Sequence, residues 1–235
     1  MRLLSYNIHK GIGGSDRLYR LERIVKVIEE HNPDIICLQE VDKNHKRSQF
    51  HDQPALLAQQ LKCPDHCYQL NVHQALGGYG NLVLSRWNIS IKHHVSLRQG
   101  SRKPRGAQLT VIDTPQGKLH LINLHLGLVE KERHWQMKHL LSHSLFKEHK
   151  DLPTLIVGDT NDWRNTLHRG VMAPNGFEHH SAPPLRFRSF PAYFPMGSLD
   201  KAFGRGVKLQ SAAVPRGGQA RWASDHLPLI VDLAI

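Results

Sequence analysis

Short runs of strand type greatly outnumber helical segments in this chain, and this constrains its fold more than any other feature. Apolar, β-branched runs cover residues 1–7, 34–38, 80–85, 89–97, 107–112, 119–124, 153–157, 199–203, 207–214 and 227–233. Runs of this length, separated by turn residues, are typical of strands, and neighbouring runs in the middle of the chain should pair antiparallel. So many strands must bury their faces against one another or beneath helices.

Two longer stretches have the periodicity of a helix. In residues 18–28 apolar side chains recur every three or four positions, and Ser15 or Asp16 is the expected cap. The second helix is expected over residues 129–149, with acidic residues in its first turn and an apolar face along its length. No internal repeat and no change of composition marks a second domain, so we expect a single domain over residues 1–235.

The composition excludes several classes of protein. Hydrophobic residues make up 40% of the chain and charged residues 22%, which is ordinary for a globular protein. No apolar run approaches the roughly 20 residues that span a bilayer. The amino terminus becomes polar too soon for a secretory signal, so we expect a soluble, cytoplasmic monomer. The net charge of +11 favours anionic partners, and both nucleic acid and an anionic membrane surface qualify.

The three cysteines do not form a disulfide framework and fit a reducing compartment. Cys63, His66 and Cys67 are close enough in sequence to hold a metal together. A structural zinc site usually has four ligands, however, and a fourth is not evident here. We therefore disfavour a zinc site in this segment.

Polar residues gather where the predicted strands end or begin. One acid after a strand is most often a turn former or a helix cap. Here several strand ends carry such residues, and strand ends meet at a shared rim where sites usually lie. Together they offer imidazoles, carboxylates and carboxamides, which can bind a hard cation and move protons around a phosphate. These residues are Asn7, Glu40, His125, Asp159, Asn161, Asp200, Asp225 and His226.

Several segments resemble, in order, the successive motifs of the endonuclease/exonuclease/phosphatase superfamily. They are SYNIHKG, IICLQEVD, GNLVLSRW, NLHLG, VGDTND, SLDKAF and SDHLPL, and they extend from residue 5 to residue 229. The resemblance implies an α/β (α+β) fold, a four-layer α/β/β/α sandwich of two mixed β-sheets flanked by helices. It places the site in a cleft at one edge of the sandwich.

The resemblance also implies a divalent metal ion and an activity. Glu40 would be the principal ligand of Mg²⁺, or of Mn²⁺ in its place, with Asn7 and Asp225 nearby. Magnesium prefers oxygen ligands and keeps several of its waters, which fits these side chains. The metal would offset negative charge on the phosphoryl group during hydrolysis of a phosphodiester or phosphomonoester bond.

The remaining residues of the site would carry the proton chemistry. By resemblance, Asp159 would orient or deprotonate the attacking water, and Asn161 would donate hydrogen bonds to the phosphoryl group. His226 would contact a phosphate oxygen or transfer a proton, with Asp200 holding its tautomer. His125 resembles a second histidine, present in only some branches, that binds phosphate or protonates the leaving oxygen.

The substrate is constrained only loosely by the sequence. Nucleases of the pancreatic deoxyribonuclease kind carry a glutamate that pairs with the equivalent of His125, and segment 78–81 contains no acid. Apurinic-site endonucleases usually lack the histidine itself, and GNLVLSRWNI is instead similar to sphingomyelinase-like members. Arg105, within the basic segment 101–105, and Arg86 are candidate substrate-binding residues that could form a basic rim for a phosphate-bearing substrate. The alternative for this segment is a solvated loop.

Three functions remain open on the sequence alone. The first is hydrolysis of a lipid or small-molecule phosphoester, favoured by the sphingomyelinase-like segment. The second is a nuclease, favoured by the net charge, with Tyr79, Trp87, Tyr193 and Phe194 available to stack on bases. The third, a non-catalytic phosphate-binding protein, is disfavoured because mere binding does not require Asp159 together with a metal ligand.

Overall fold

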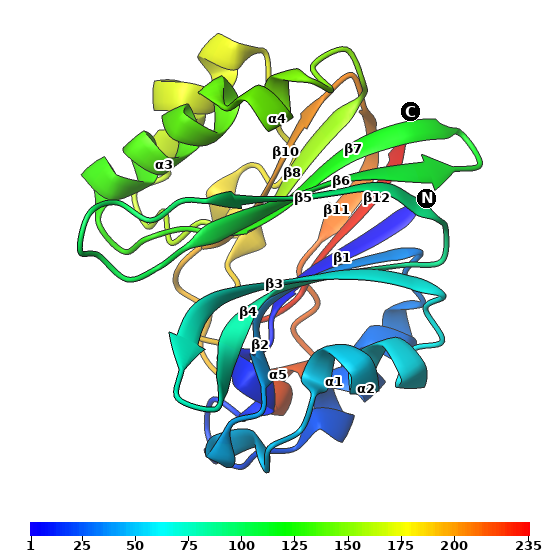
Figure 1. The fold of residues 1–235 in the computed structure, drawn as a ribbon, viewed down its shortest axis with the longest axis vertical. Helices are drawn as coiled ribbons and strands as arrows, with labels where there is room; N and C mark the ends of the chain where they lie inside the picture. The colour runs from blue at the N-terminus through cyan, green and yellow to red at the C-terminus, as the bar shows by residue number, and fades with distance from the viewer.

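The computed structural model describes residues 1–235, and two six-stranded sheets stacked face to face form its centre (Figure 1). The strands are β1 (Arg2–Asn7), β2 (Ile35–Lys43), β3 (Asp65–Gln74), β4 (Gly77–Ser85), β5 (Ile89–Ser96), β6 (Gly106–Thr114), β7 (Gly117–His125), β8 (Thr154–Asp159), β9 (Glu178–His179), β10 (Asp200–Arg205), β11 (Lys208–Ala213) and β12 (Leu229–Ala234). The first sheet has the order β11-β12-β1-β2-β4-β3 and the second the order β5-β6-β7-β8-β10-β9.

Both sheets are mixed. In the first, β1 runs parallel to β2, and in the second β7 runs parallel to β8. The other pairings are antiparallel, including β5 with β6 and β6 with β7 in the middle of the chain, as the sequence predicts. Parallel neighbours end at the same edge of a sheet, so each sheet brings two strand ends together.

Helices cover the two outer faces. They are α1 (Leu21–His31), α2 (Gln53–Gln60), α3 (Glu130–Ser142), α4 (Ser144–Lys147) and α5 (Ala220–Ala223). In Figure 1, α1, α2 and α5 lie under the first sheet, and α3 and α4 lie over the second. This confirms the predicted four-layer α/β/β/α sandwich. No helix combines the length and apolar character needed to cross a bilayer.

The apolar residues form three layers that match this architecture. The central one lies between the sheets and includes Leu3, Val83 and Leu121, all fully buried. A second packs the first sheet against α1 and α2, and a third packs the second sheet against α3 and α4. Strands buried on both faces explain why the central runs are apolar throughout instead of alternating.

Both predicted helices differ from the structure, the first at its start and the second by a break within its length. The first begins at Leu21, because the Asp16 carboxylate accepts hydrogen bonds from the Leu18 amide (3.0 Å) and from Arg23 (2.7 Å) and so holds the preceding segment in a turn. The second is broken at His143, which is extended (ψ 141°) and whose ring accepts a hydrogen bond from the Leu145 amide to start α4.

The sequence analysis missed one helix and one strand between β2 and β4. Helix α2 is short and begins at a capping side chain, Asp52, which accepts a hydrogen bond from the Ala55 amide at 3.2 Å. Strand β3 lies at the edge of its sheet and carries many polar side chains that are only partly buried. Neither element has a strong apolar pattern, because each buries few of its residues.

Candidate active site

The strand pairing brings the predicted residues to one edge of the sandwich. Asn7, at the end of β1, pairs with Gln39 of β2, so Glu40 follows directly beside it. In the second sheet, His125 at the end of β7 pairs with Asp159 at the end of β8. Asp200 opens the antiparallel strand β10 opposite Asp159. Two parallel strand pairs and one antiparallel neighbour therefore account for the convergence of five chain segments.

Asp159 is the centre of the cluster and joins the two sheets. Its Oδ2 accepts a hydrogen bond from the Asn7 side-chain amide at 2.9 Å, and its Oδ1 accepts one from the Asn161 backbone N–H at 3.0 Å. The Nε2 atoms of His125 and His226 lie 3.3 and 3.6 Å from the same Oδ2. Burial raises the pKa of this carboxyl, His226 lowers it, and the result is about 6. Such a group can accept a proton near neutral pH.

His226 is held as a cation. Its Nδ1 lies 2.8 Å from Asp200 Oδ2, which also accepts a hydrogen bond from the Ser189 hydroxyl at 2.5 Å. Burial lowers the pKa of the imidazole, but Asp200 and Asp159 raise it by more, and it reaches about 10. A protonated imidazole donates from both nitrogens. With Nδ1 directed to Asp200, Nε2 faces Asp159 as a second donor.

His125 has the opposite character. Arg105 Nη1 lies 3.1 Å from its Nδ1. A guanidinium can only donate, so Nδ1 must be the acceptor and Nε2 must carry the ring hydrogen. Burial first, and then the Arg105 charge, hold the pKa of His125 well below its usual range. The ring is therefore a neutral donor toward Asp159. The partner of His125 at Nδ1 is thus an arginine, and segment 78–81 contains no carboxylate.

Glu40 occupies a strained position in β2. The pairing of β2 with β4 shifts register between Leu38 and Val41, and Glu40 has a left-handed backbone with φ of 56°. Backbone strain of this kind costs on the order of 1–3 kcal/mol and is concentrated at functional sites. Lys10 donates a hydrogen bond to the Glu40 carboxylate. Burial would raise the pKa of Glu40, but Lys10, through its charge and its hydrogen bond, and the neighbouring histidines together outweigh it, and the net shift is downward.

Asp225 and Asn161 complete the predicted set. The Ser224 hydroxyl donates to the Asn7 carbonyl at 2.7 Å, which places Asp225 beside Asn7. Asp225 is partly exposed, and its Oδ1 lies 3.9 Å from the His9 ring. The Asn161 side-chain amide donates to the Leu126 carbonyl at 3.0 Å. One N–H of that amide is thereby used, and one is left for another acceptor.

The structure does not bring Arg86 to this cluster. Its guanidinium lies 3.2 Å from Asp34 Oδ1 and also binds the Asn32 side chain. Asp34 precedes β2, so this ion pair lies at the opposite end of that strand from Glu40. Of the two predicted substrate-binding arginines, only Arg105 lies at the cluster.

The cysteines of segment 63–67 do not form a metal cluster with His66. Cys63 faces the Leu61 carbonyl, and the Cys67 thiol lies 3.2 Å from the ring of His94. The groups of three or more histidine, cysteine or acidic side chains whose ligand atoms converge lie elsewhere in the chain.

Three contributors to the site were missed. Lys10 lies inside the motif SYNIHKG and Ser189 inside the segment before Asp200, and each was passed over because its partner is distant in sequence. The third is a buried bridge between the sheets, in which the Gln39 amide donates to the Asn123 side chain at 2.7 Å. The sequence does contain a signal for this contact. Gln39 is an amide that follows a run of apolar residues in β2, and a buried amide needs a hydrogen-bond partner.

Tyr79 lies in a ring of positive charge next to the cluster. The Lys10 ammonium is 4.9 Å from the centre of its ring, the Arg47 guanidinium 5.3 Å and the Lys103 ammonium 5.4 Å. Lys103 and Arg105 also line a hollow of about 290 Å³. The edge of the sandwich beside His125 is therefore suited to an anionic group.

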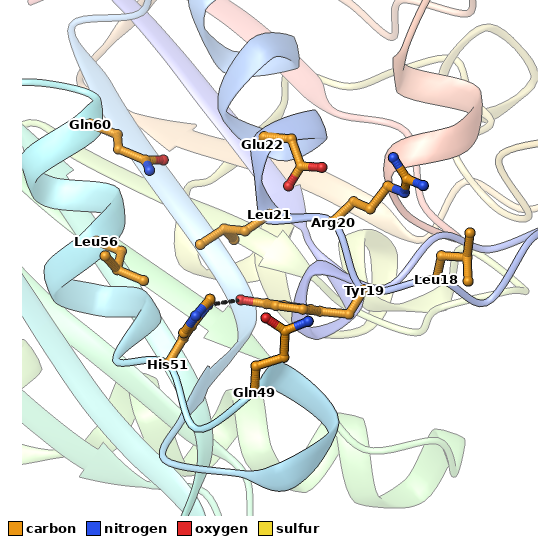
Figure 2. Close-up of a pocket in the computed structure, with 9 residues that line it drawn as sticks. All are labelled: Leu18, Tyr19, Arg20, Leu21, Glu22, Gln49, His51, Leu56 and Gln60. Carbon is orange, nitrogen blue, oxygen red and sulfur yellow. Dashed lines mark hydrogen bonds between the residues drawn. The ribbon is translucent and has the colours of Figure 1, made fainter.

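A larger hollow lies away from these residues. It measures about 650 Å³, and none of the predicted site residues lines it. In Figure 2 the Tyr19 hydroxyl and the His51 ring point toward each other there, 2.8 Å apart. Size alone does not identify the site in this protein, since the convergent carboxylates and imidazoles lie elsewhere.

Two mixed sheets packed face to face, with carboxylates and imidazoles at the ends of their parallel strands, define the class of protein as an α/β/β/α sandwich with a polar edge site. The chain belongs to the endonuclease/exonuclease/phosphatase family, whose model matches residues 4–226. The enzymes that give the family its name hydrolyse phosphoester bonds.

Similar proteins support this assignment. The uncharacterized protein YbhP of Escherichia coli K12 is 30% identical over 249 aligned positions, which cover 99% of this chain and 95% of YbhP. A family member from Beutenbergia cavernae has a similar structure with a TM-score of 0.81 and 21% identity, covering 100% of this chain and 71% of that one. A mannosyl-6-phosphatase from Bacteroides thetaiotaomicron gives a TM-score of 0.73 at 17% identity, with 100% of both chains covered. At these identities the two structures support the fold alone.

Proposed function

We propose that this protein is a divalent-metal-dependent phosphoesterase that hydrolyses a small-molecule or lipid phosphoester. The observation that carries the proposal is the buried Asp159 carboxylate, which is held by Asn7 and Asn161 and faced by two imidazoles in different protonation states. A purely structural carboxylate would need partners, but it would not need one neutral and one cationic histidine within 4 Å.

The metal would be held by Glu40, with Asn7 and Asp225 beside it. The chemistry of the donor set supports this, because the available atoms are oxygens and two of the three groups are carboxylates. A cation beside Glu40 is already accommodated in the form of the Lys10 ammonium. When bound, Mg²⁺ or Mn²⁺ would stabilise the charge that develops on the phosphoryl and leaving oxygens.

Three side chains of the edge site bind the phosphoryl group and accept the proton of the attacking water. Asp159 accepts the proton of the attacking water, with its orientation fixed by Asn7 and Asn161. His226 donates from Nε2 to an oxygen of the phosphoryl group, while Asp200 holds its other nitrogen. His125 acts as a neutral donor from Nε2 to a second oxygen. Because Arg105 occupies its Nδ1, we do not assign it the role of proton donor to the leaving group.

The hollow beside His125 supports a compact substrate. It is about 290 Å³ and is lined by the cationic side chains Arg102, Lys103 and Arg105 and by the apolar pair Leu128 and Val129. One acid, Glu132, also lines it, and its carboxylate lies 3.5 Å from Arg102 Nη1, so the cations outnumber the acids. A phosphate with a second anionic or polar group would fit such a lining.

A nuclease is the second candidate, and two observations favour it. The net charge is +11, and the Tyr193 and Phe194 side chains are 59% and 65% exposed, which leaves them free to stack on bases. The other two candidates are less available, because Tyr79 is buried and Trp87 packs against the central core.

A substrate panel tests the proposal. We would measure hydrolysis of bis-p-nitrophenyl phosphate, p-nitrophenyl phosphate, phospholipid vesicles and supercoiled plasmid, each with Mg²⁺, with Mn²⁺ and with EDTA. Asp159→Asn is expected to reduce turnover by about 10²- to 10⁴-fold, the usual contribution of a positioned base. The matched control is Asp113→Asn, since Asp113 pairs with Lys118 at the surface.

Each outcome has a meaning for the proposal. Metal-dependent turnover of the small esters or the phospholipid, lost in Asp159→Asn alone, supports it. Cleavage of plasmid alone, weakening steeply with salt, identifies the nuclease instead. Turnover that resists EDTA, or a wild-type rate in Asp159→Asn, contradicts the assigned mechanism.

A further inference from the structure

A second group of histidines lies on the outer face of the second sheet. His93 is on β5, and Glu148 and His149 directly follow α4. One ligand atom from each of these three side chains lies within 4.8 Å of the others. His93 is more than fifty positions from the other two in the chain, so this convergence is produced by the fold.

The fold fixes both sides of the cluster. His93 pairs with Leu109 of β6, which belongs to the apolar layer beneath α3 and α4, so the His93 side chain faces that layer. On the other side, the turn after α4 is closed by the Glu148 amide, which donates to the Ser144 carbonyl at 2.9 Å. The Leu152 amide donates to the His149 carbonyl at 3.1 Å. The candidate ligands are therefore held by ordered backbone.

One histidine of this group and one histidine beside it have buried nitrogens without hydrogen-bond partners. His149 Nε2 is a buried nitrogen of the group itself. The neighbour is His120 on β7, which is fully buried, and neither of its ring nitrogens has a partner. Its ring meets that of His149 edge-on, with 5.4 Å between the centres. Buried ring nitrogens without partners are costly and rare in folded proteins, and coordination of a metal ion would satisfy the nitrogen of His149.

We propose that His93, Glu148 and His149 bind a transition-metal ion of the zinc type. Two imidazole nitrogens and one carboxylate oxygen are ligands that zinc accepts, whereas magnesium requires oxygen ligands and retains its waters. Three protein ligands leave a fourth position for a water or another group. The unpartnered His120 ring packs against His149 beside the site. Arg205, the neighbouring cation, directs its guanidinium to the Lys150 carbonyl at 3.1 Å.

The site is separate from the catalytic cluster. His120 pairs with Thr154 at the start of β8, whereas His125 pairs with Asp159 at the end of the same strand pair. A metal here would join the turn after α4 to β5, an edge strand of the second sheet. We therefore expect it to stabilise the fold and not to take part in turnover.

Calorimetric titration of the zinc-free chain with Zn²⁺ tests the site. Saturating Mg²⁺ is present throughout so that the oxygen site at Glu40 is filled. We expect one zinc ion per chain in the wild type and an affinity at least about a hundredfold weaker in His93→Gln and in His149→Gln. Both side chains are partly exposed, so the variants should fold, and circular dichroism checks this. The matched control is His73→Gln, an exposed histidine of β3.

Two further measurements make the test independent of affinity alone. Zn²⁺ should raise the melting temperature of the wild type and of His73→Gln but not that of His93→Gln. Co²⁺ in place of zinc should give the visible absorption of a nitrogen-ligated ion, and this should persist in Glu40→Gln. The proposal is overturned if the wild type binds no zinc, if His93→Gln and His149→Gln bind it as tightly as the wild type, or if Glu40→Gln abolishes binding.

Discussion

The two histidine clusters of this protein both include residues of the second sheet and differ in how their rings are paired. At the proposed catalytic edge, His226 has Asp200 on one nitrogen and His125 has Arg105, so each ring has a defined protonation state. On the outer face, buried nitrogens of His120 and His149 face no partner at all.

This difference separates two uses of the same side chain. An imidazole that is fixed by a charged neighbour is ready to donate or accept a proton at a set position. An imidazole that lacks a partner has lone pairs to offer, which is what a borderline metal requires. The identity of the neighbouring group therefore indicates the chemistry of a histidine better than its burial does, because both clusters contain buried rings.

The largest expected effect is that of replacing His226 at the catalytic edge. His226→Gln should reduce kcat/KM by about 10²- to 10⁴-fold, because the cationic donor facing the phosphoryl group is lost. His149→Gln, on the outer face, should leave kcat/KM unchanged. Steady-state kinetics on the best substrate of the panel compares the two variants. A loss of less than tenfold in His226→Gln would make that ring structural.

A second prediction concerns a buried charge behind the catalytic edge. Burial lowers the pKa of Lys201 to about 8, from an ordinary value of 10.5, although its ammonium donates to Asn165 Oδ1 and to the Ser198 carbonyl, each at 2.6 Å. Between these two pH values the unfolded chain binds more protons than the folded one, so stability rises with pH. Relative to Lys201→Met, the wild type should gain on the order of 3 kcal/mol across that range.

Urea denaturation of both proteins at several pH values between neutral and alkaline conditions measures this gain. If the difference between them does not change with pH, the two hydrogen bonds fully offset the burial of the ammonium. The Lys201 ammonium would then be fully paired, in contrast to the buried nitrogens of His120 and His149 on the outer face.

The smallest expected effect concerns the proposed Mg²⁺ site at Glu40. Glu40→Gln should raise the Mg²⁺ concentration needed for half-maximal turnover by about tenfold or more, because a carboxylate ligand is lost. Lys10→Met should lower it, because the ammonium no longer neutralises Glu40. Titration of activity with Mg²⁺ gives both values. If Glu40→Gln reaches half-maximal turnover at the same Mg²⁺ concentration as the wild type or at a lower one, the metal is held elsewhere.

The sequence pattern indicated sheets covered by helices, with polar residues at the strand ends, because these features depend on local signals. The four-layer arrangement and the roles of the site residues were implied by the family resemblance. Glu40 and Asp159 each follow an apolar strand inside an ordered motif, and the strand runs themselves are continuous and apolar. Helix α2 and strand β3 were missed because their packing leaves many polar residues partly exposed, so they lack a clear period.

What escaped prediction depends on contacts between distant segments. Arg86 lies within the motif GNLVLSRW, yet its guanidinium pairs with Asp34, at the end of β2 opposite to Glu40. Lys10 was not predicted, although it donates a hydrogen bond to Glu40, the acid of the site whose backbone is left-handed. The group of His93, Glu148 and His149 has no sequence signature, since a strand and a turn after a helix supply it separately. Side-chain pairing across the fold decides these cases.

The position of β12 makes the polar edge depend on segments that are far apart in sequence. This strand lies between β11 and β1 and pairs antiparallel with Arg2–Ser5. Asp225 and His226 immediately precede it. We therefore expect these two side chains to join the cluster around Asp159 only after β12 has paired with β1. Closing a loop of this length costs conformational entropy, so the edge should be assembled late in folding.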